Sequence, residues 1–274
     1  MNAAWHILFA IALVAYFLGA VHFPANLFLK DPRLTRVGMT VSLVGVLCHG
    51  VSIILRGVDN RMLPFSSAGD GWSFLAWAVV IVFLSVSGRP ALRSLGAFAL
   101  PAALVSVLVG VATSRLEPNP ILDQVPAWEL ALHVPASILS LGAFSVAFAC
   151  TVCYLIEDRL LREKRLGGLW RSLPPLDVLD NTAYWLVVFG FCLLTVGMLS
   201  GLILAQEQWT GAWLLHPKMY ATVLLWLTYA AYLYVRIVAN WRGRRTHVIV
   251  VMVVLLVAVI YGSAVFLSPL TANH

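Results

Sequence analysis

Charged residues are scarce in this sequence: Asp, Glu, Lys and Arg make up only 11% of the 274 residues, whereas hydrophobic residues make up 61%. An ordinary soluble domain carries about twice that share of charge, so the composition excludes that class. Residues 1–23 also lack the basic segment and the small-residue cleavage site of a signal peptide. We therefore expect them to form a membrane span.

Long polar stretches are missing too, because apolar runs fill most of the chain. A helix needs roughly 20 apolar residues to cross about 30 Å of hydrocarbon. The runs lack the alternation of a β-barrel, and backbone groups in lipid must be hydrogen-bonded within the protein. We therefore expect an all-α, polytopic integral membrane bundle, a single membrane domain over residues 1–274. Its eight expected transmembrane helices span residues 4–23, 37–56, 72–88, 94–114, 128–156, 184–205, 218–239 and 246–268.

Basic residues are rare on one side of the expected membrane. The loop after the first span lies on the other side. Of the 18 Lys and Arg residues, all but four lie on the same side of the membrane as that loop; the four exceptions are Arg56, Arg61, Arg115 and Lys218. By the positive-inside rule the side rich in Lys and Arg is cytoplasmic, and both termini are extracytoplasmic. The net charge of +6 then reflects topology and contact with anionic lipid headgroups in the bilayer, and it gives no support for nucleic-acid binding.

Cysteines outside the expected spans are absent, because Cys48, Cys150, Cys153 and Cys192 all lie within them. No disulfide can therefore link the outer loops. Cys150 and Cys153 have a C-x-x-C spacing, but no βαβ pattern surrounds them. Tyr154 follows, where a c-type haem attachment motif has His. We interpret the pair as small residues at a helix contact.

Catalytic patterns are missing as well. No paired carboxylates lie in the expected spans, no nucleophile lies beside a base, and no spacing is that of zinc ligands. We therefore do not expect an independent enzyme. No repeat or pair of broken apolar segments supports an inverted-repeat transporter. Gly197 and Gly201 form a G-x-x-x-G pair, which is expected to pack either within the bundle or between chains.

Histidines are present, and most lie toward the outer side of the expected bundle. His49, followed by Gly50, lies in the outer third of its span, and His133 lies just inside the start of another, two residues before Pro135. A histidine within a membrane usually faces the bundle or a wet cavity, and is a functional candidate. The alternative for His49 is a core histidine bonded to a neighbouring hydroxyl or carbonyl. We interpret the histidines at helix ends as interfacial anchors: His6, His22 and His247.

Two tryptophans, Trp209 and Trp213, precede His216 between the sixth and seventh apolar runs. On a helix, residues four apart share a face, so the two indoles would form a platform for a planar macrocycle. The alternative is an aromatic belt at the membrane interface. Imidazole ligates iron, and axial histidines hold haem. With His133 and the terminal His274 on the same side, these residues indicate an outer haem site.

This loop resembles that of the cytochrome c assembly family, which includes CcsA, CcmC, HemX and YpjD-like membrane proteins. The family's tryptophan-rich signature reads W-G-x-x-W-x-W-D-P-K. Here WTGAWLLHPK matches it without a gap at Trp209, Trp213, Pro217 and Lys218. Leu215 stands in place of the third tryptophan, His216 in place of the aspartate, and the glycine is displaced to Gly211. The resemblance extends over roughly residues 40–274.

The resemblance also implies roles for single histidines. His133 corresponds to the family's outer-face histidine at the start of a span, and His49 to its histidine in an early span. His274 is the candidate for the second outer-face histidine, displaced toward the terminus. Tyr234 replaces the histidine usually found before the arginine of the seventh span. The implied candidate iron ligands are therefore His133, His49 and His274, beside the platform of Trp209, Trp213 and His216.

Family resemblance implies a multi-pass protein of the bacterial inner membrane that binds b-type haem non-covalently at its extracytoplasmic face during cytochrome c maturation. Delivery of that haem is expected to need a separate ResB/CcsB-like or other maturation protein. The incomplete signature favours the HemX or YpjD-like branch, with a role in haem binding or homeostasis. Two alternatives remain: a small-molecule permease with His49 lining its path, and a scaffold that contacts a haem-synthesis enzyme through residues 157–183.

Overall fold

The computed structural model describes residues 3–60, 67–113, 127–165, 167, 172–208 and 217–255. Within these ranges every regular element is a helix, and residues 244–255 form a further helical stretch. The prediction of an all-α protein is therefore confirmed for the described residues. The elements are α1 (Ala3–Leu29), α2 (Pro32–Asn60), α3 (Ala68–Val86), η1 (Pro90–Leu95), α4 (Gly96–Thr113), α5 (Ala127–Arg162), α6 (Leu176–Gln208) and α7 (Pro217–Ile237).

Six of the helical segments are long and apolar enough to cross a membrane, and they coincide with the first six expected spans. The chain is thus a multi-pass membrane protein. α7 covers most of the seventh expected span, and residues 244–255 cover the beginning of the eighth. The remainder of that span lies outside the described residues, so the count of eight spans and the sidedness of the termini stay predictions.

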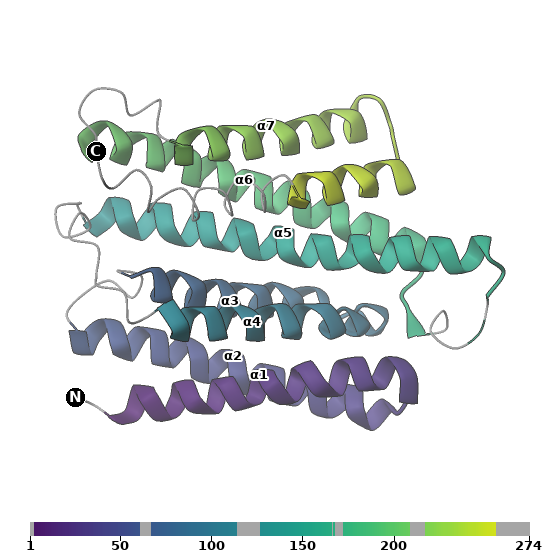
Figure 1. The fold of residues 1–274 in the computed structure, drawn as a ribbon, viewed down its shortest axis with the longest axis horizontal. Coiled ribbons are helices and arrows are strands. Elements are labelled where there is room, and N and C mark those ends of the chain that lie inside the picture. The colour runs from purple at the N-terminus through teal and green to yellow at the C-terminus, as the bar shows by residue number, and fades with distance from the viewer. Residues whose placement is uncertain are drawn as a thin grey trace.

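Successive helices run in opposite directions and lie side by side (Figure 1). α1 packs against α2 and α4, α3 packs against α4 and α5, and α5 packs against α6, which contacts α7. α3 and α4 therefore lie between the pair α1 and α2 and the pair α5 and α6 (Figure 1). We call the end where α1, α3, α5 and α7 begin the rim end. The opposite end, where most Lys and Arg residues lie, is the basic end.

Local sequence explains how several of these helices begin or continue. Before α3, the Ser67 hydroxyl accepts a hydrogen bond from the Asp70 amide, and the Asp70 carboxylate accepts one from the Ser67 amide, both at 3.1 Å. This reciprocal capping satisfies two amides that a helix start leaves without partners. Pro135 lies inside α5, so the helix continues through it and the carbonyl of Ala131 loses its usual amide partner.

Close helix contacts depend on residues without large side chains. A Cβ added to Gly142 on α5 would lie 3.0 Å from the Ala78 backbone on α3, and one added to Gly96 would lie 2.6 Å from the Phe23 ring on α1. These distances leave no room for a side chain, so α5 meets the α3 backbone directly at Gly142, and the Phe23 ring packs onto the chain at Gly96. The middle helices thereby form the core on which both ends of the bundle are built.

Candidate functional site

His133 lies on α5 near the rim end and contacts α6. Its Nδ1 is 2.8 Å from the carbonyl oxygen of Gly197 and 3.4 Å from the hydroxyl of Ser200. A carbonyl only accepts hydrogen bonds, so we assign the ring hydrogen to Nδ1 and the lone pair to Nε2. Nε2 is therefore the ring atom that can coordinate a metal ion through its lone pair.

Two glycines of α6 make room for this part of α5. A Cβ added to Gly201 would lie 2.7 Å from Cε1 of His133, and one added to Gly197 would lie 2.5 Å from the Ser137 hydroxyl. The G-x-x-x-G pair therefore packs within the bundle, which is one of the two arrangements expected from the sequence. Its consequence is that the imidazole of His133 lies directly against the α6 backbone.

The other residues predicted for the outer haem site lie outside the described residues; they are Trp209, Trp213, His216 and His274. The segment 209–216 connects the end of α6, at Gln208, to the start of α7, at Pro217. Both of these helix ends lie at the rim end, as does the start of α5 with His133 (Figure 1). Chain connectivity thus attaches the tryptophan loop to the end of the bundle that carries His133.

His49 on α2 is fully buried and both of its ring nitrogens have hydroxyl partners. Nε2 is 2.8 Å from the Ser73 hydroxyl on α3, and Nδ1 is 3.2 Å from the Tyr16 hydroxyl on α1. An iron atom would have to displace one of these hydroxyls. Because α3 and α4 separate α2 from α5 (Figure 1), the structure does not bring His49 and His133 together.

A small cavity of about 40 Å³ is lined by Ser73, the hydroxyl partner of His49, together with Ser52 and an ion pair. That pair joins Arg56 to Asp70 at 2.7 Å, and the Arg56 guanidinium lies 5.5 Å from the centre of the Trp5 ring. A space of this size holds water rather than an organic molecule. The cavity is therefore too small to hold a porphyrin or another organic molecule.

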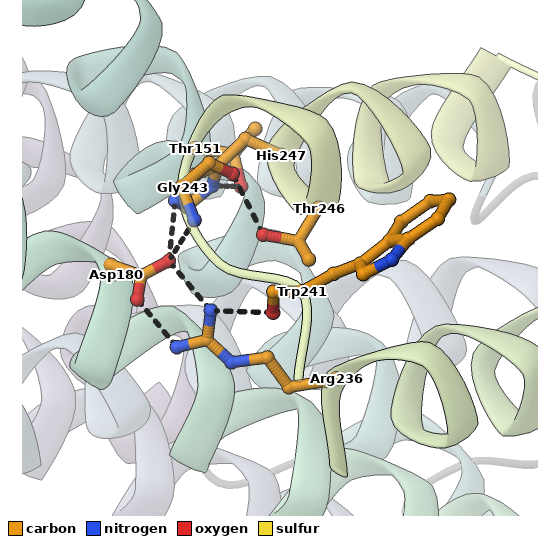
Figure 2. Close-up of polar contacts among 7 residues, drawn as sticks. All are labelled: Thr151, Asp180, Arg236, Trp241, Gly243, Thr246 and His247. Carbon is orange, nitrogen blue, oxygen red and sulfur yellow. Dashed lines mark hydrogen bonds and ion pairs between the residues drawn. The ribbon is translucent and has the colours of Figure 1, made fainter. Parts of the chain in front are cut away.

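A third polar cluster, absent from our sequence prediction, lies near the basic end and centres on Asp180 of α6 (Figure 2). The Arg236 guanidinium on α7 donates to both carboxylate oxygens, with Nη1 3.1 Å from Oδ1. Nη1 also donates to the Trp241 carbonyl at 3.3 Å, and the Gly243 amide donates to Asp180 at 3.4 Å. Asp180 thus joins α6 to α7 and to the chain that follows α7.

His247 completes this cluster from the helical stretch after α7 (Figure 2). Its Nε2 is 3.3 Å from Asp180 Oδ1, its Nδ1 is 3.0 Å from the Thr151 hydroxyl, and its ring stacks on Tyr154 at 4.0 Å. Our interpretation of His247 as an interfacial anchor is therefore wrong, because its side chain is buried against α5 and α6. The chain reverses direction before it, at Gly243, whose φ of +75° favours glycine.

One signal in the sequence pointed to the Asp180 cluster. Asp180 lies just before the sixth expected span and Arg236 lies within the seventh, near the same expected end, and the two charges have opposite signs. Charges in such positions usually pair with one another. The buried cysteines Cys150 and Cys153 lie on the same stretch of α5 as Thr151 and are free thiols in the core, which agrees with their interpretation as helix-contact residues.

The described residues contain no group of three or more His, Cys, Asp and Glu side chains that could hold a metal ion. A cage of several protein ligands is therefore not formed by this part of the chain. What the described part of the rim end does offer is the oriented imidazole of His133, and imidazole is a common axial ligand of haem iron.

Comparison with known proteins agrees with the family expected from the sequence. The family model described as "Cytochrome C assembly protein" matches residues 4–269. This match begins well before residue 40, so it includes α1 as well. Similar proteins named "Cytochrome c biogenesis protein CcsA" include one from Chlorella vulgaris, 27% identical over 76% of each chain. Another, from Synechococcus sp. (strain CC9605), is 29% identical over 83% of each chain. A third, from Synechococcus sp. (strain CC9902), is 27% identical over 95% of this chain and 94% of its own.

Proposed function

Because the chain belongs to the cytochrome c assembly protein family, we propose that it is a membrane haem-handling protein of cytochrome c biogenesis. It holds haem at the extracytoplasmic face, and the haem is bound non-covalently, as a b-type group. The observation that carries this proposal is the oriented imidazole of His133 at the end of the bundle to which the tryptophan loop is attached. Bound haem would supply the redox-active iron, and the chain would supply its binding site.

His133 is the iron ligand in this proposal. Metal-binding histidines commonly donate their second ring N–H to a carbonyl or carboxylate, which fixes the ring and raises its basicity. The bond from Nδ1 of His133 to the Gly197 carbonyl is of this kind. Gly201 adds a second constraint, because its missing side chain defines where the imidazole lies. Nε2 is then the ligating atom. His49, whose two nitrogens are occupied by hydroxyls, takes no part in the site as we propose it.

The tryptophan loop supplies the remaining contacts in this proposal. Trp209 and Trp213 would lie against the macrocycle, and His216 or His274 would be the second axial ligand. Non-covalent attachment agrees with the position of the C-x-x-C pair, because Cys150 and Cys153 are buried in the core. Neither thiol is available at the rim end to form a thioether bond.

Sidedness in this proposal follows from the positive-inside rule. The basic end is then cytoplasmic, the rim end and His133 are extracytoplasmic, and the membrane is the bacterial inner membrane. Haem bound at the rim end would be accessible to a cytochrome on that side. A separate ResB/CcsB-like or other maturation protein would present the thiols that accept the haem.

An absorption spectrum of the purified chain with added haemin tests this function. We expect a Soret band of bound haem. His133→Ala is expected to weaken haemin binding roughly tenfold or more, because losing even an outer-shell partner of a ligand costs about 10–100-fold. His22→Ala is the matched control, because His22 lies on α1 at the basic end and, among the described residues, its ring bonds within its own helix, to the Leu18 carbonyl at 2.7 Å. Equal effects of both substitutions, or no Soret band at all, would contradict the proposal.

A further inference from the structure

We propose that a groove at the basic end, formed by α3, η1 and α6, binds an anionic phospholipid. The groove has a volume of about 670 Å³ and is lined mainly by apolar side chains. It lies between the last turn of α3, the Gly88 turn and the first turns of α6. This site is at the opposite end of the bundle from His133, so it is independent of the haem site proposed above.

The charge at the mouth of the groove is that of Arg89. Its side chain is exposed, and it forms no ion pair with any acidic residue in the part of the chain that the structure describes. None of the described residues that line the groove is Asp or Glu. Arg93, in contrast, donates from Nε to the Ser87 carbonyl at 3.4 Å. A guanidinium without a counter-ion at the end of membrane-spanning helices is complementary to a lipid phosphate.

The wall of the groove contains a hydroxyl without a partner. Thr182 on α6 is only 6% exposed, and its Oγ1 forms no hydrogen bond with any described residue. A threonine on a helix normally donates to a carbonyl of the preceding turn, and a buried hydroxyl left without a partner is unfavourable. The ester carbonyl of a phospholipid glycerol would accept this hydrogen bond.

Beyond Thr182 the groove is apolar and open to the side. Trp185 and Phe189 follow on the same face of α6 and are 60% and 51% exposed. They lie along the membrane-spanning part of α6, where an acyl chain is the surrounding material. At the turn, no described residue other than the chain neighbours of Gly88 has an atom within 4 Å of where its Cβ would lie, so the groove is open at this point. The guanidinium, the hydroxyl and the apolar wall therefore follow one another along the groove. Their order matches that of the phosphate, the ester and the acyl chain in a phospholipid.

Native mass spectrometry of the full chain in mild detergent tests this site, with palmitoyl-oleoyl-phosphatidylglycerol as the anionic probe and palmitoyl-oleoyl-phosphatidylcholine as the zwitterionic one. We expect Arg89→Gln to weaken binding of the anionic lipid roughly fivefold, the loss typical of one basic side chain near an anionic lipid surface. Arg36→Gln is the matched control, because Arg36 is an exposed arginine of α2 at the same end and does not line the groove. It is expected to leave binding unchanged.

A second variant tests the groove itself rather than the charge. Gly88→Leu adds a side chain where the turn is open, and it is expected to weaken binding of the anionic lipid without lowering the melting temperature of the lipid-free protein. Equal losses for Arg89→Gln and Arg36→Gln would overturn the proposal, since they would show only a general charge effect. The proposal would also be overturned if haemin displaced the lipid from this groove and Arg89→Gln lost that haemin binding, because the occupant would then be a porphyrin.

Discussion

The Asp180 carboxylate of α6 accepts hydrogen bonds at both of its oxygens from the Arg236 guanidinium of α7, and both side chains are largely buried. This paired geometry is the most specific one that a guanidinium and a carboxylate can form. α7 begins directly after the tryptophan loop, at Pro217, and ends next to this pair, at Ile237. The position of α7 is therefore determined partly at the basic end.

Breaking the Asp180–Arg236 pair is expected to destabilise the protein. Asp180→Asn leaves the buried guanidinium without a counter-charge, and removing one member of a buried pair costs about 3–5 kcal/mol. The measurement is thermal unfolding in detergent. Arg159→Gln is the control, because its ion pair with Glu163 is exposed and exposed pairs contribute little. Equal melting temperatures for the two variants would show that the Asp180 pair does not hold α7 in place.

Gly201→Ala is expected to weaken haemin binding although it leaves His133 unchanged. The added methyl would lie 2.7 Å from Cε1 of the His133 ring, so the imidazole must move away from the position set by Gly197. Haemin titration followed at the Soret band measures the effect, which we expect to be about tenfold by analogy with other changes around a ligand. Gly71→Ala is the control, since a Cβ at Gly71 meets no atom within 4 Å. Equal haemin affinities of Gly201→Ala and the unsubstituted protein would contradict this prediction.

His49→Ala is expected to lower stability and to leave haemin binding intact. The change leaves the hydroxyls of Tyr16 and Ser73 without their partner and removes a fully buried ring. Together these effects cost about 2–4 kcal/mol. Thermal unfolding and the Soret titration are measured on the same sample. Loss of the Soret band without loss of stability would instead identify His49 as an iron ligand.

Replacing the indoles of the tryptophan loop tests the platform. We expect Trp209→Ala and Trp213→Ala each to weaken haemin binding about three- to tenfold, the range that aromatic contacts contribute. Trp72→Ala is the control, because Trp72 is a partly exposed tryptophan near the start of α3, also at the rim end. A uniform loss across all three variants would indicate a general interfacial role for tryptophan, not a haem platform.

Helix ends show how far hydropathy alone can be used. The fifth span was expected over residues 128–156, but α5 extends over Ala127–Arg162. Its last turns are charged and are held by pairs four residues apart, Arg162 with Asp158 and Arg159 with Glu163. A count of apolar residues stops at the first charges, whereas the helix continues as long as its backbone bonds and such pairs are satisfied.

The candidate site was predictable only in part. Motif similarity selected His133, and the structure adds the bond from its Nδ1 to the Gly197 carbonyl, more than sixty positions later in the chain. Pattern and spacing assigned His247 to the membrane interface, whereas contacts with Thr151, Tyr154 and Asp180 bury it. Such contacts join helices that are distant in the sequence, so no local pattern contains them.

By itself, the sequence determined that this protein is helical, lies in a membrane and belongs to its family. An apolar run in a bilayer can hydrogen-bond its backbone groups only by forming a helix, unless it is part of a barrel. The family's motif is a short continuous stretch, so it can be recognised without the fold. Only the tertiary structure decided which nitrogen of His133 keeps its lone pair, which partners enclose His49, and that Asp180 pairs with Arg236. Those outcomes depend on how close two separate helices come to each other. At His133, Gly197 and Gly201 allow that close approach.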